Sequence, residues 1–179
     1  KVAEAKYFNT NFFHKKDVDV LPLLQTIASI IGGGYSFNRT TSKLEFTNSK
    51  KQTLQAINTA SGIKSFGLLQ LLLQADVLNS KSVLIIDEPE NHLHPEWQLK
   101  YAQVIVELVK ANIPVLLTSH SPYMIKALQH YSSQAGLHEK TNFYFSKPEK
   151  TQVIIEEVSN LSIIFKSLSK PFTDLVWNS

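Results

Sequence analysis

Cysteine is absent from the 179 residues, and arginine occurs once, at Arg39. Without cysteine the chain has no disulfide framework, no Cys-based zinc site and no thiol nucleophile, which fits a reducing compartment, and we expect a cytoplasmic protein. Arginine is the usual reader of guanine edges and phosphates, so this segment is not expected to read a DNA sequence. The formal net charge of +3 is too small to indicate a nucleic-acid partner by itself.

Long apolar runs are also missing. Segments 66–73 and 104–109 are interrupted by Gln70 and Glu107, and both are far shorter than the roughly 18 residues of a membrane-spanning helix. We therefore expect no membrane partner. No signal-peptide pattern follows Lys1, and the missing initiator Met leads us to expect that the native chain begins upstream. The hydrophobic content of 43% suffices for the core of one domain or one lobe.

The chain divides into three regions. Residues 1–50 combine an aromatic-rich start, a helix that ends at the glycines 32–34, and a small hairpin, and we expect a satellite of the core. Residues 51–140 alternate between helical and strand patterns. Residues 141–179 contain two strand-like runs, at 143–146 and 153–156, separated by a turn predicted at 147–150, and a helix of the same domain. The middle region has the order helix 61–77, strand 82–87, helix 95–110, strand 114–119 and a helix from Ser121.

This order predicts an α/β fold with a mostly parallel sheet flanked by helices and a small β-hairpin region. The strand at 83–86 is apolar without alternation, which is typical of a central parallel strand covered on both faces. In the helix at 95–110, five apolar residues share one stripe and are expected in the core. They are Trp97, Tyr101, Val104, Ile105 and Leu108.

Polar side chains follow both strands of the β-α-β segment. Asp87 and Glu88 end the first strand, and His120 ends the second, so all three are expected at the same edge of the sheet. A carboxylate at Asp87 suits a hydrated Mg²⁺, and one at Glu88 suits an attacking water. A histidine at position 120 suits a hydrogen bond to that water or to a γ-phosphate.

On these residues the chain resembles the second half of an ABC-type ATPase head, within the P-loop NTPases and most like the OLD, SMC and Rad50 branch. The resemblance covers about residues 59–128 and rests on four motifs in the order that the family has. They are a signature loop at 59–64, a Walker B strand at 83–88, a D-loop at 91–94 and a switch histidine at His120.

The resemblance implies that Ser61 and the Gly62 amide contact the γ-phosphate of ATP bound by a second head, with the positive end of a helix dipole behind them. It therefore implies ATP and Mg²⁺ as cofactors and a second copy of the head as partner. Four positions depart from the family's pattern, and in the signature loop Ala60 replaces Leu and Ile63 replaces the second Gly. Lys64 replaces Gln and either adds charge to the phosphate contact or faces solvent, and His94 replaces the usual Asp of the D-loop.

No P-loop, G-x-x-x-x-G-K-[ST], occurs in the chain. Gly62 and Gly67 have the right separation, but Leu68 and Leu69 follow where Lys and Ser or Thr are needed. We therefore expect ATP hydrolysis only when a P-loop lobe completes the head, and we favour a lobe that precedes Lys1 over one supplied by a separate chain.

Two other functions remain open at this stage. Asp87, Glu88, His92 and His94 have the ligand types of a metal-dependent hydrolase or nuclease. Alternatively, the fold serves as a nucleotide-gated interaction module with little turnover. Within the ABC-type ATPases, the segments 60–65 and 87–95 resemble the OLD-like ATPases of Septu and retron antiviral defence, which implies a nuclease partner and DNA-associated work.

Overall fold

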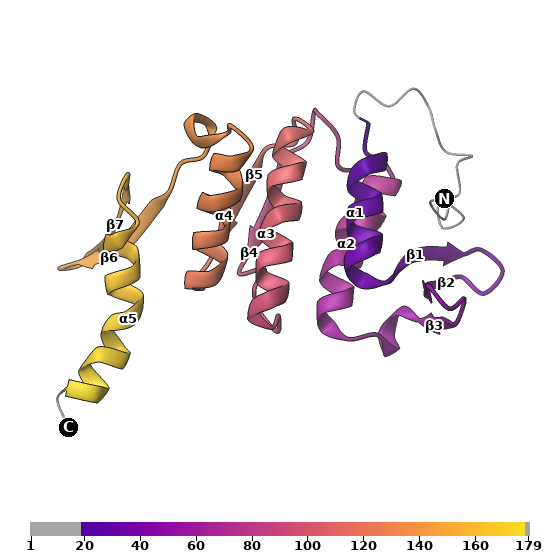
Figure 1. The fold of residues 1–179 in the computed structure, drawn as a ribbon, viewed down its shortest axis with the longest axis horizontal. Helices are drawn as coiled ribbons and strands as arrows, with labels where there is room; N and C mark the ends of the chain where they lie inside the picture. Colours follow the sequence, from indigo (N-terminus) through magenta and orange to yellow (C-terminus); the bar gives the residue numbers. More distant parts are fainter. Residues whose placement is uncertain (1–18, 178–179) are drawn as a thin grey trace.

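The computed structural model describes residues 19–177, so the aromatic residues expected at the start of the first region lie outside the described residues. Figure 1 shows the arrangement of the elements. The helices are α1 (Leu21–Ile31), α2 (Ser61–Gln74), α3 (Pro95–Lys110), α4 (Pro122–Gln134) and α5 (Ser162–Trp177). The strands are β1 (Gly33–Asn38), β2 (Lys43–Asn48), β3 (Thr53–Gln55), β4 (Leu84–Asp87), β5 (Val115–Thr118), β6 (Tyr144–Glu149) and β7 (Gln152–Glu157).

The first region contains the predicted helix and hairpin. Pro22 lies in the first turn of α1, and Gly32 ends the helix with a φ of 67°, a left-handed conformation that glycine adopts without strain. β1 and β2 then pair antiparallel, with Tyr35 opposite Phe46. A third strand, β3, pairs with β2, and the sequence pattern did not predict it.

The β4–α3–β5–α4 order of the middle region is confirmed. β4 and β5 pair in parallel, with Asp87 opposite Thr118 at their carboxyl ends. Ser121 caps α4 as expected, because its hydroxyl accepts a hydrogen bond from the Met124 N–H. Both α3 and α4 have proline in the first turn, where the missing N–H removes no helical bond.

The main core lies between α1, α2, α3 and α4 and one face of β4 and β5. The predicted stripe of α3 contributes to it: Tyr101, Val104, Ile105 and Leu108 are buried, and Trp97 packs against them half-buried. Phe66 of α2 contacts both Trp97 and Tyr101 edge to face, with ring centroids 5.6 and 5.0 Å apart. These contacts fix α2 against α3.

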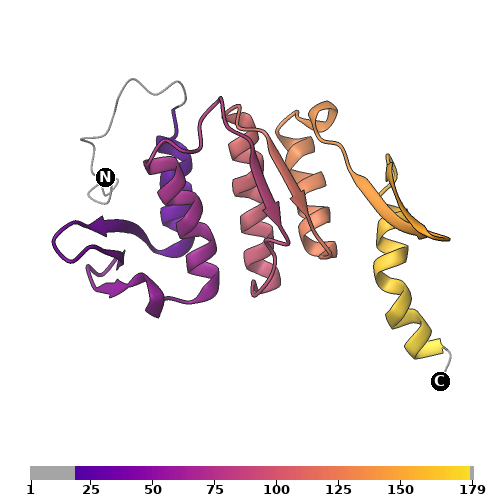
Figure 2. The same cartoon turned by 180° about the vertical axis from the view of Figure 1, so that it is seen from behind.

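Within residues 19–177 nothing covers the other face of the parallel sheet, so the prediction that the strand at 83–86 is covered on both faces is wrong for this part of the chain. Val83, Ile85 and Leu116 are 63%, 72% and 58% exposed. Figure 2 shows β4 and β5 in front of α3 and α4, with no other element across them. The apolar run gave no sign of this, because a strand has the same composition whether its second face is covered by this segment or by another.

The last region begins with β6 and β7, which extend beyond the predicted runs. Lys147, Pro148 and Glu149 belong to β6 rather than to the turn, and the turn lies at Lys150 and Thr151. α5 follows, and its Ile164 packs with Leu161, just before the helix, and with Ile125 of α4 in a second, smaller cluster. Within residues 19–177, no helix is long and apolar enough to cross a membrane.

Candidate functional site

Four segments of the predicted site meet at one edge of the molecule. In Figures 1 and 2 the carboxyl ends of β4 and β5 and the first turns of α2, α3 and α4 all lie at the lower end of the view. β4 and β5 pair in parallel, and α3 and α4 each begin shortly after one of these strands ends, so their first turns lie at this edge. The structure thus brings together the segments predicted as the Walker B end, the D-loop and the switch histidine, with the predicted signature at the start of α2 beside them.

Asp87 ends β4 and is exposed at this edge. The hydroxyl of Thr118, directly opposite on β5, donates a hydrogen bond to Asp87 Oδ1. The second carboxylate oxygen remains available. A hydrated Mg²⁺ needs only one or two carboxylates and otherwise keeps its waters, so this oxygen donor fits the ion.

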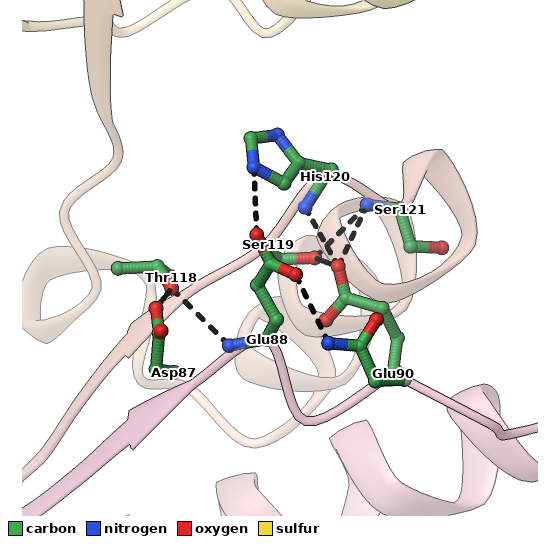
Figure 3. A network of polar contacts seen from close by, with 8 residues as sticks. Asp87, Glu88, Glu90, Thr118, Ser119, His120 and Ser121 are labelled. Carbon is green, nitrogen blue, oxygen red and sulfur yellow. Dashed lines mark hydrogen bonds and ion pairs between the residues drawn. The ribbon is translucent and has the colours of Figure 1, made fainter.

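Glu88 and His120 form a pair across the two strand ends, as Figure 3 shows. His120 Nε2 lies 2.8 Å from Glu88 Oε1. The imidazole is 78% exposed and the Glu88 side chain 34% exposed, so solvent reaches both groups. The predicted convergence of these two residues is therefore present in the structure.

The backbone and neighbours of Glu88 aim its side chain at His120. Glu88 has a φ of 45°, a left-handed conformation that costs a residue with a side chain about 1 kcal/mol or more. Its N–H donates to the carbonyl and the hydroxyl of Thr118, both at 3.2 Å. Asn91 Nδ2 donates to Glu88 Oε2 at 3.0 Å. Oε1 of Glu88 thus contacts His120 in the loop before α4, and Oε2 contacts Asn91 in the loop after β4.

Glu90 is a member of this site that the sequence analysis missed. It lies two residues beyond Glu88 and is only 9% exposed. Its Oε1 accepts hydrogen bonds from the Ser119 hydroxyl at 2.8 Å and from the N–H groups of His120 and Ser121 at 2.6 and 3.1 Å. No local pattern indicates contacts between residues about 30 positions apart; burial of an acidic side chain is visible only in the structure.

A second buried contact joins the same loops. The Ser121 hydroxyl donates to Gln98 Oε1, and Gln98 Nε2 donates to the carbonyl of Leu93 at 2.9 Å. Gln98 and Ser121 are 9% and 8% exposed. The segment between β4 and α3 and the loop before α4 are therefore connected twice, once through Glu90 and once through Gln98.

The residues predicted as the signature begin α2, next to the predicted D-loop. A Cβ atom on Gly62 would lie 3.1 Å from Leu93 Cδ2 and 3.2 Å from Trp97 Cε3, so this glycine allows a close approach. Ser61 is exposed at the first position of the helix, and no side chain caps that end. Lys64 Nζ donates to the carbonyl of Ile57 at 2.8 Å, which anchors the loop before the helix.

Gly67 has a packing role in the middle of α2. A Cβ atom there would lie 2.2 Å from Tyr35 Cε2. The Tyr35 hydroxyl contacts Thr59 Oγ1 at 2.5 Å, its N–H donates to Gln70 Oε1 at 2.8 Å, and burial raises the pKa of Tyr35. Gly62 and Gly67 therefore each allow a separate close approach of another segment to α2, and these two contacts explain their P-loop-like spacing.

His94 caps α3. Its Nδ1 accepts a hydrogen bond from the Glu96 N–H at 3.4 Å, which leaves Nε2 facing outward. His92 is exposed, with a φ of 65°. Across residues 19–177, no three His, Asp or Glu side chains gather as metal ligands would. The metal-dependent hydrolase that uses Asp87, Glu88 and the two histidines thus finds no support in the geometry.

A hollow of about 500 Å³ opens beside His120. It lies between the start of α4 and one side of α5, with Pro122, Phe165 and Leu168 among its apolar lining and Lys166 at its rim. The exposed side of the imidazole therefore faces open space rather than packed protein.

The comparisons with known proteins agree with this geometry. The family model described as "AAA domain, putative AbiEii toxin, Type IV TA system" matches residues 3–126. Septu protein PtuA of Bacillus thuringiensis is 37% identical over 54 residues, which cover 28% of this chain and 13% of that protein. The chain thus spans about an eighth of the length of this relative.

Two solved structures share the fold. An Smc head domain with a coiled coil and joint from Pyrococcus yayanosii has a TM-score of 0.61 and 12% identity, over 83% of this chain and 28% of that one. A chain solved in work on ATP-driven dimerisation and DNA-stimulated activation of SMC ATPases has a TM-score of 0.57 and 12% identity, over 83% and 92% of the two chains. These likenesses establish a fold similar to part of an SMC ATPase head.

Proposed function

The chain belongs to the family of AAA domains defined by that model, and we propose that it forms the catalytic half of an ABC-type head that binds and hydrolyses ATP. The observation that carries the proposal is the contact of 2.8 Å between Glu88 and His120 at the carboxyl edge of two parallel strands. Ligands of open α/β sheets bind at this edge.

Each residue of the edge has a distinct role. Glu88 accepts the proton of the attacking water or orients that water, and His120 donates a hydrogen bond to the water or to the γ-phosphate. Asp87 holds Mg²⁺, which when bound neutralises charge on the phosphate oxygens. Thr118 keeps Asp87 in place through the hydrogen bond across the strands.

A P-loop lobe supplied by another segment completes the head in this proposal. Two observations support it: the 179 residues contain no P-loop motif, and the apolar face around Ile85 and Leu116 is open. Covering these side chains gains about 25 cal/mol for each Å² of apolar surface removed from water, which favours association with a lobe of complementary shape.

A second head supplies the γ-phosphate that the signature residues contact. Ser61 and the Gly62 amide occupy an uncapped helix start, which favours an anion through its free N–H groups and dipole. Lys64 lies one turn further along the helix and is exposed, and His94 begins the neighbouring helix at the same edge. The signature would thus act between two copies of the chain.

The similarity to Septu protein PtuA supports a proposed role in antiviral defence. The nuclease partner, the association with DNA and the cytoplasmic location in this proposal come from the sequence resemblance and the composition. Because the matched segment covers 28% of this chain, the role of the whole assembly is a proposal separate from ATP hydrolysis. The SMC-like fold supports the self-association of two heads.

Calorimetric titration with ATP and Mg²⁺ tests the proposal. The chain alone is expected to bind ATP only weakly, because it lacks the phosphate-binding amides and the lysine of a P-loop. The full-length ATPase that contains the P-loop lobe is expected to bind in the micromolar range. Micromolar binding by the isolated chain would show that its nucleotide site does not depend on a second lobe.

A further inference from the structure

Glu90 connects the loop after β4 to all three residues that join β5 to α4. A single oxygen, Oε1, accepts from the Ser119 hydroxyl and from the backbone N–H groups of His120 and Ser121, at 2.6 to 3.1 Å (Figure 3). Three donors on consecutive residues leave this loop little freedom to shift. The other oxygen, Oε2, is buried and accepts no hydrogen bond from the described residues.

The imidazole of His120 is exposed and lies against Glu88. Its side chain is not packed in the core, so the place of its ring depends on where its backbone is held. The closest of the three Glu90 contacts, 2.6 Å, is to that backbone N–H. We propose that Glu90 is a positioning residue that holds His120 within hydrogen-bond distance of Glu88; for turnover, this rests on the function proposed above.

The second connection extends this role to the neighbouring D-loop. Gln98 binds the Leu93 carbonyl and the Ser121 hydroxyl, and Gly62 of the signature helix packs closely on Leu93. Leu93, which contacts the start of α2, is thus connected through Gln98 to the loop that bears His120. Glu90 is the direct bridge, and Gln98 is the indirect one.

Two substitutions of Glu90 test whether the acceptor oxygen at Oε1 is what holds the loop. Glu90→Gln keeps an acceptor at Oε1 and places an amide at the Oε2 position, where no donor is displaced, so it should preserve the three contacts. Glu90→Ala removes the acceptor and leaves two N–H groups and a hydroxyl unpaired. Leu24→Ala, in the core of α1, serves as the control for loss of stability without a change at this edge.

The first measurement uses the chain of 179 residues and needs no ATPase activity. Imidazole ¹⁵N spectra, with His120 assigned by comparison with His120→Gln, report whether Nε2 carries a proton in a hydrogen bond. We expect the hydrogen-bonded Nε2 signal in the wild type, in Glu90→Gln and in Leu24→Ala, and its loss in Glu90→Ala. A wild-type signal in Glu90→Ala would overturn the proposal.

The second measurement uses the full-length ATPase with its P-loop lobe. Glu90→Ala should lower kcat about 100-fold, the size of one missing general acid–base contact, with KM for ATP within about twofold. Glu90→Gln should recover most of that loss. Equal kcat in wild type and Glu90→Ala, with a reduced kcat in His120→Gln, would contradict the role of Glu90 in turnover. If His120→Gln also had no effect on kcat, the proposed role of His120 in ATP hydrolysis would fail. In that case the spectra would still test whether Glu90 positions His120.

Discussion

Substitution of Gly67 by Ala tests the packing explanation of this glycine against its resemblance to a phosphate loop. A Cβ atom would meet three ring atoms of Tyr35 at 2.2, 2.4 and 2.9 Å, whereas ordinary contact begins at 3.4 Å. The ring or the helix must therefore move by about 1.2 Å, the difference between 3.4 and 2.2 Å. In a well-packed core, an extra methyl group of this kind costs about 1–3 kcal/mol.

The ring of Tyr35 has little room to move. Its hydroxyl contacts Thr59 at 2.5 Å, its N–H donates to Gln70 at 2.8 Å, and its ring lies 5.2 Å from that of Phe46. Loss of one of these hydrogen bonds adds about 1 kcal/mol, and the better helix propensity of alanine returns about 1 kcal/mol. The net expectation for Gly67→Ala is a destabilisation of about 1–3 kcal/mol.

Urea unfolding followed by circular dichroism measures this change, and a double substitution isolates its cause. In a Tyr35→Ala background the ring is absent, so Gly67→Ala should become stabilising by about 1 kcal/mol through helix propensity alone. The reversal of sign is the diagnostic result. If Gly67→Ala were neutral in the wild-type background, or equally destabilising in both backgrounds, the contact with Tyr35 would not be the reason for glycine.

Three other predictions concern the dimer, the open sheet face and the core. Ser61→Arg in the full-length ATPase should leave ATP binding near normal but abolish ATP-dependent dimerisation and hydrolysis; mixing it with a P-loop-dead variant should restore partial activity, and an inactive mixture of verified heterodimers would count against a signature that acts between heads. Ile85→Ser should change the stability of this chain by less than about 0.5 kcal/mol but weaken its association with the P-loop lobe, and unchanged association would show that this face is not the contact. Burial raises the pKa of Tyr101 to about 12 from 10.0, so its contribution to stability is present below pH 10 and is lost between pH 10 and 12; the loss amounts to about 3 kcal/mol, and Tyr101→Phe should lack it in alkaline unfolding curves.

Local patterns predicted most of the fold because they are set by neighbouring residues. The proline at the start of α3 and α4 and the serine cap at Ser121 gave the helix starts, and the apolar stripe of α3 gave its buried side. The parallel order then brought Glu88 and His120 together. These features depend on spacing within a few residues and on one rule of strand connection.

Other features could not be predicted because they depend on contacts distant in the sequence. Ile85 and Leu116 are exposed because no element of the described residues packs on their side of the sheet, and the apolar pattern of the strands does not indicate this. The burial of Glu90 follows from a loop about 30 residues away. The turn between β6 and β7 falls after Pro148 because the strand pairing continues through that proline.

Steady-state phosphate release by the full-length ATPase carrying Glu88→Gln is the most direct test of the catalytic site. The substitution keeps the size of the side chain but removes the carboxylate that we propose acts on water, so we expect turnover to fall at least about 100-fold while ATP still binds. Glu96→Gln, an exposed change next to Lys100, is the matched control and should leave turnover unchanged. Wild-type turnover in Glu88→Gln would contradict the assignment of Glu88 as the catalytic carboxylate.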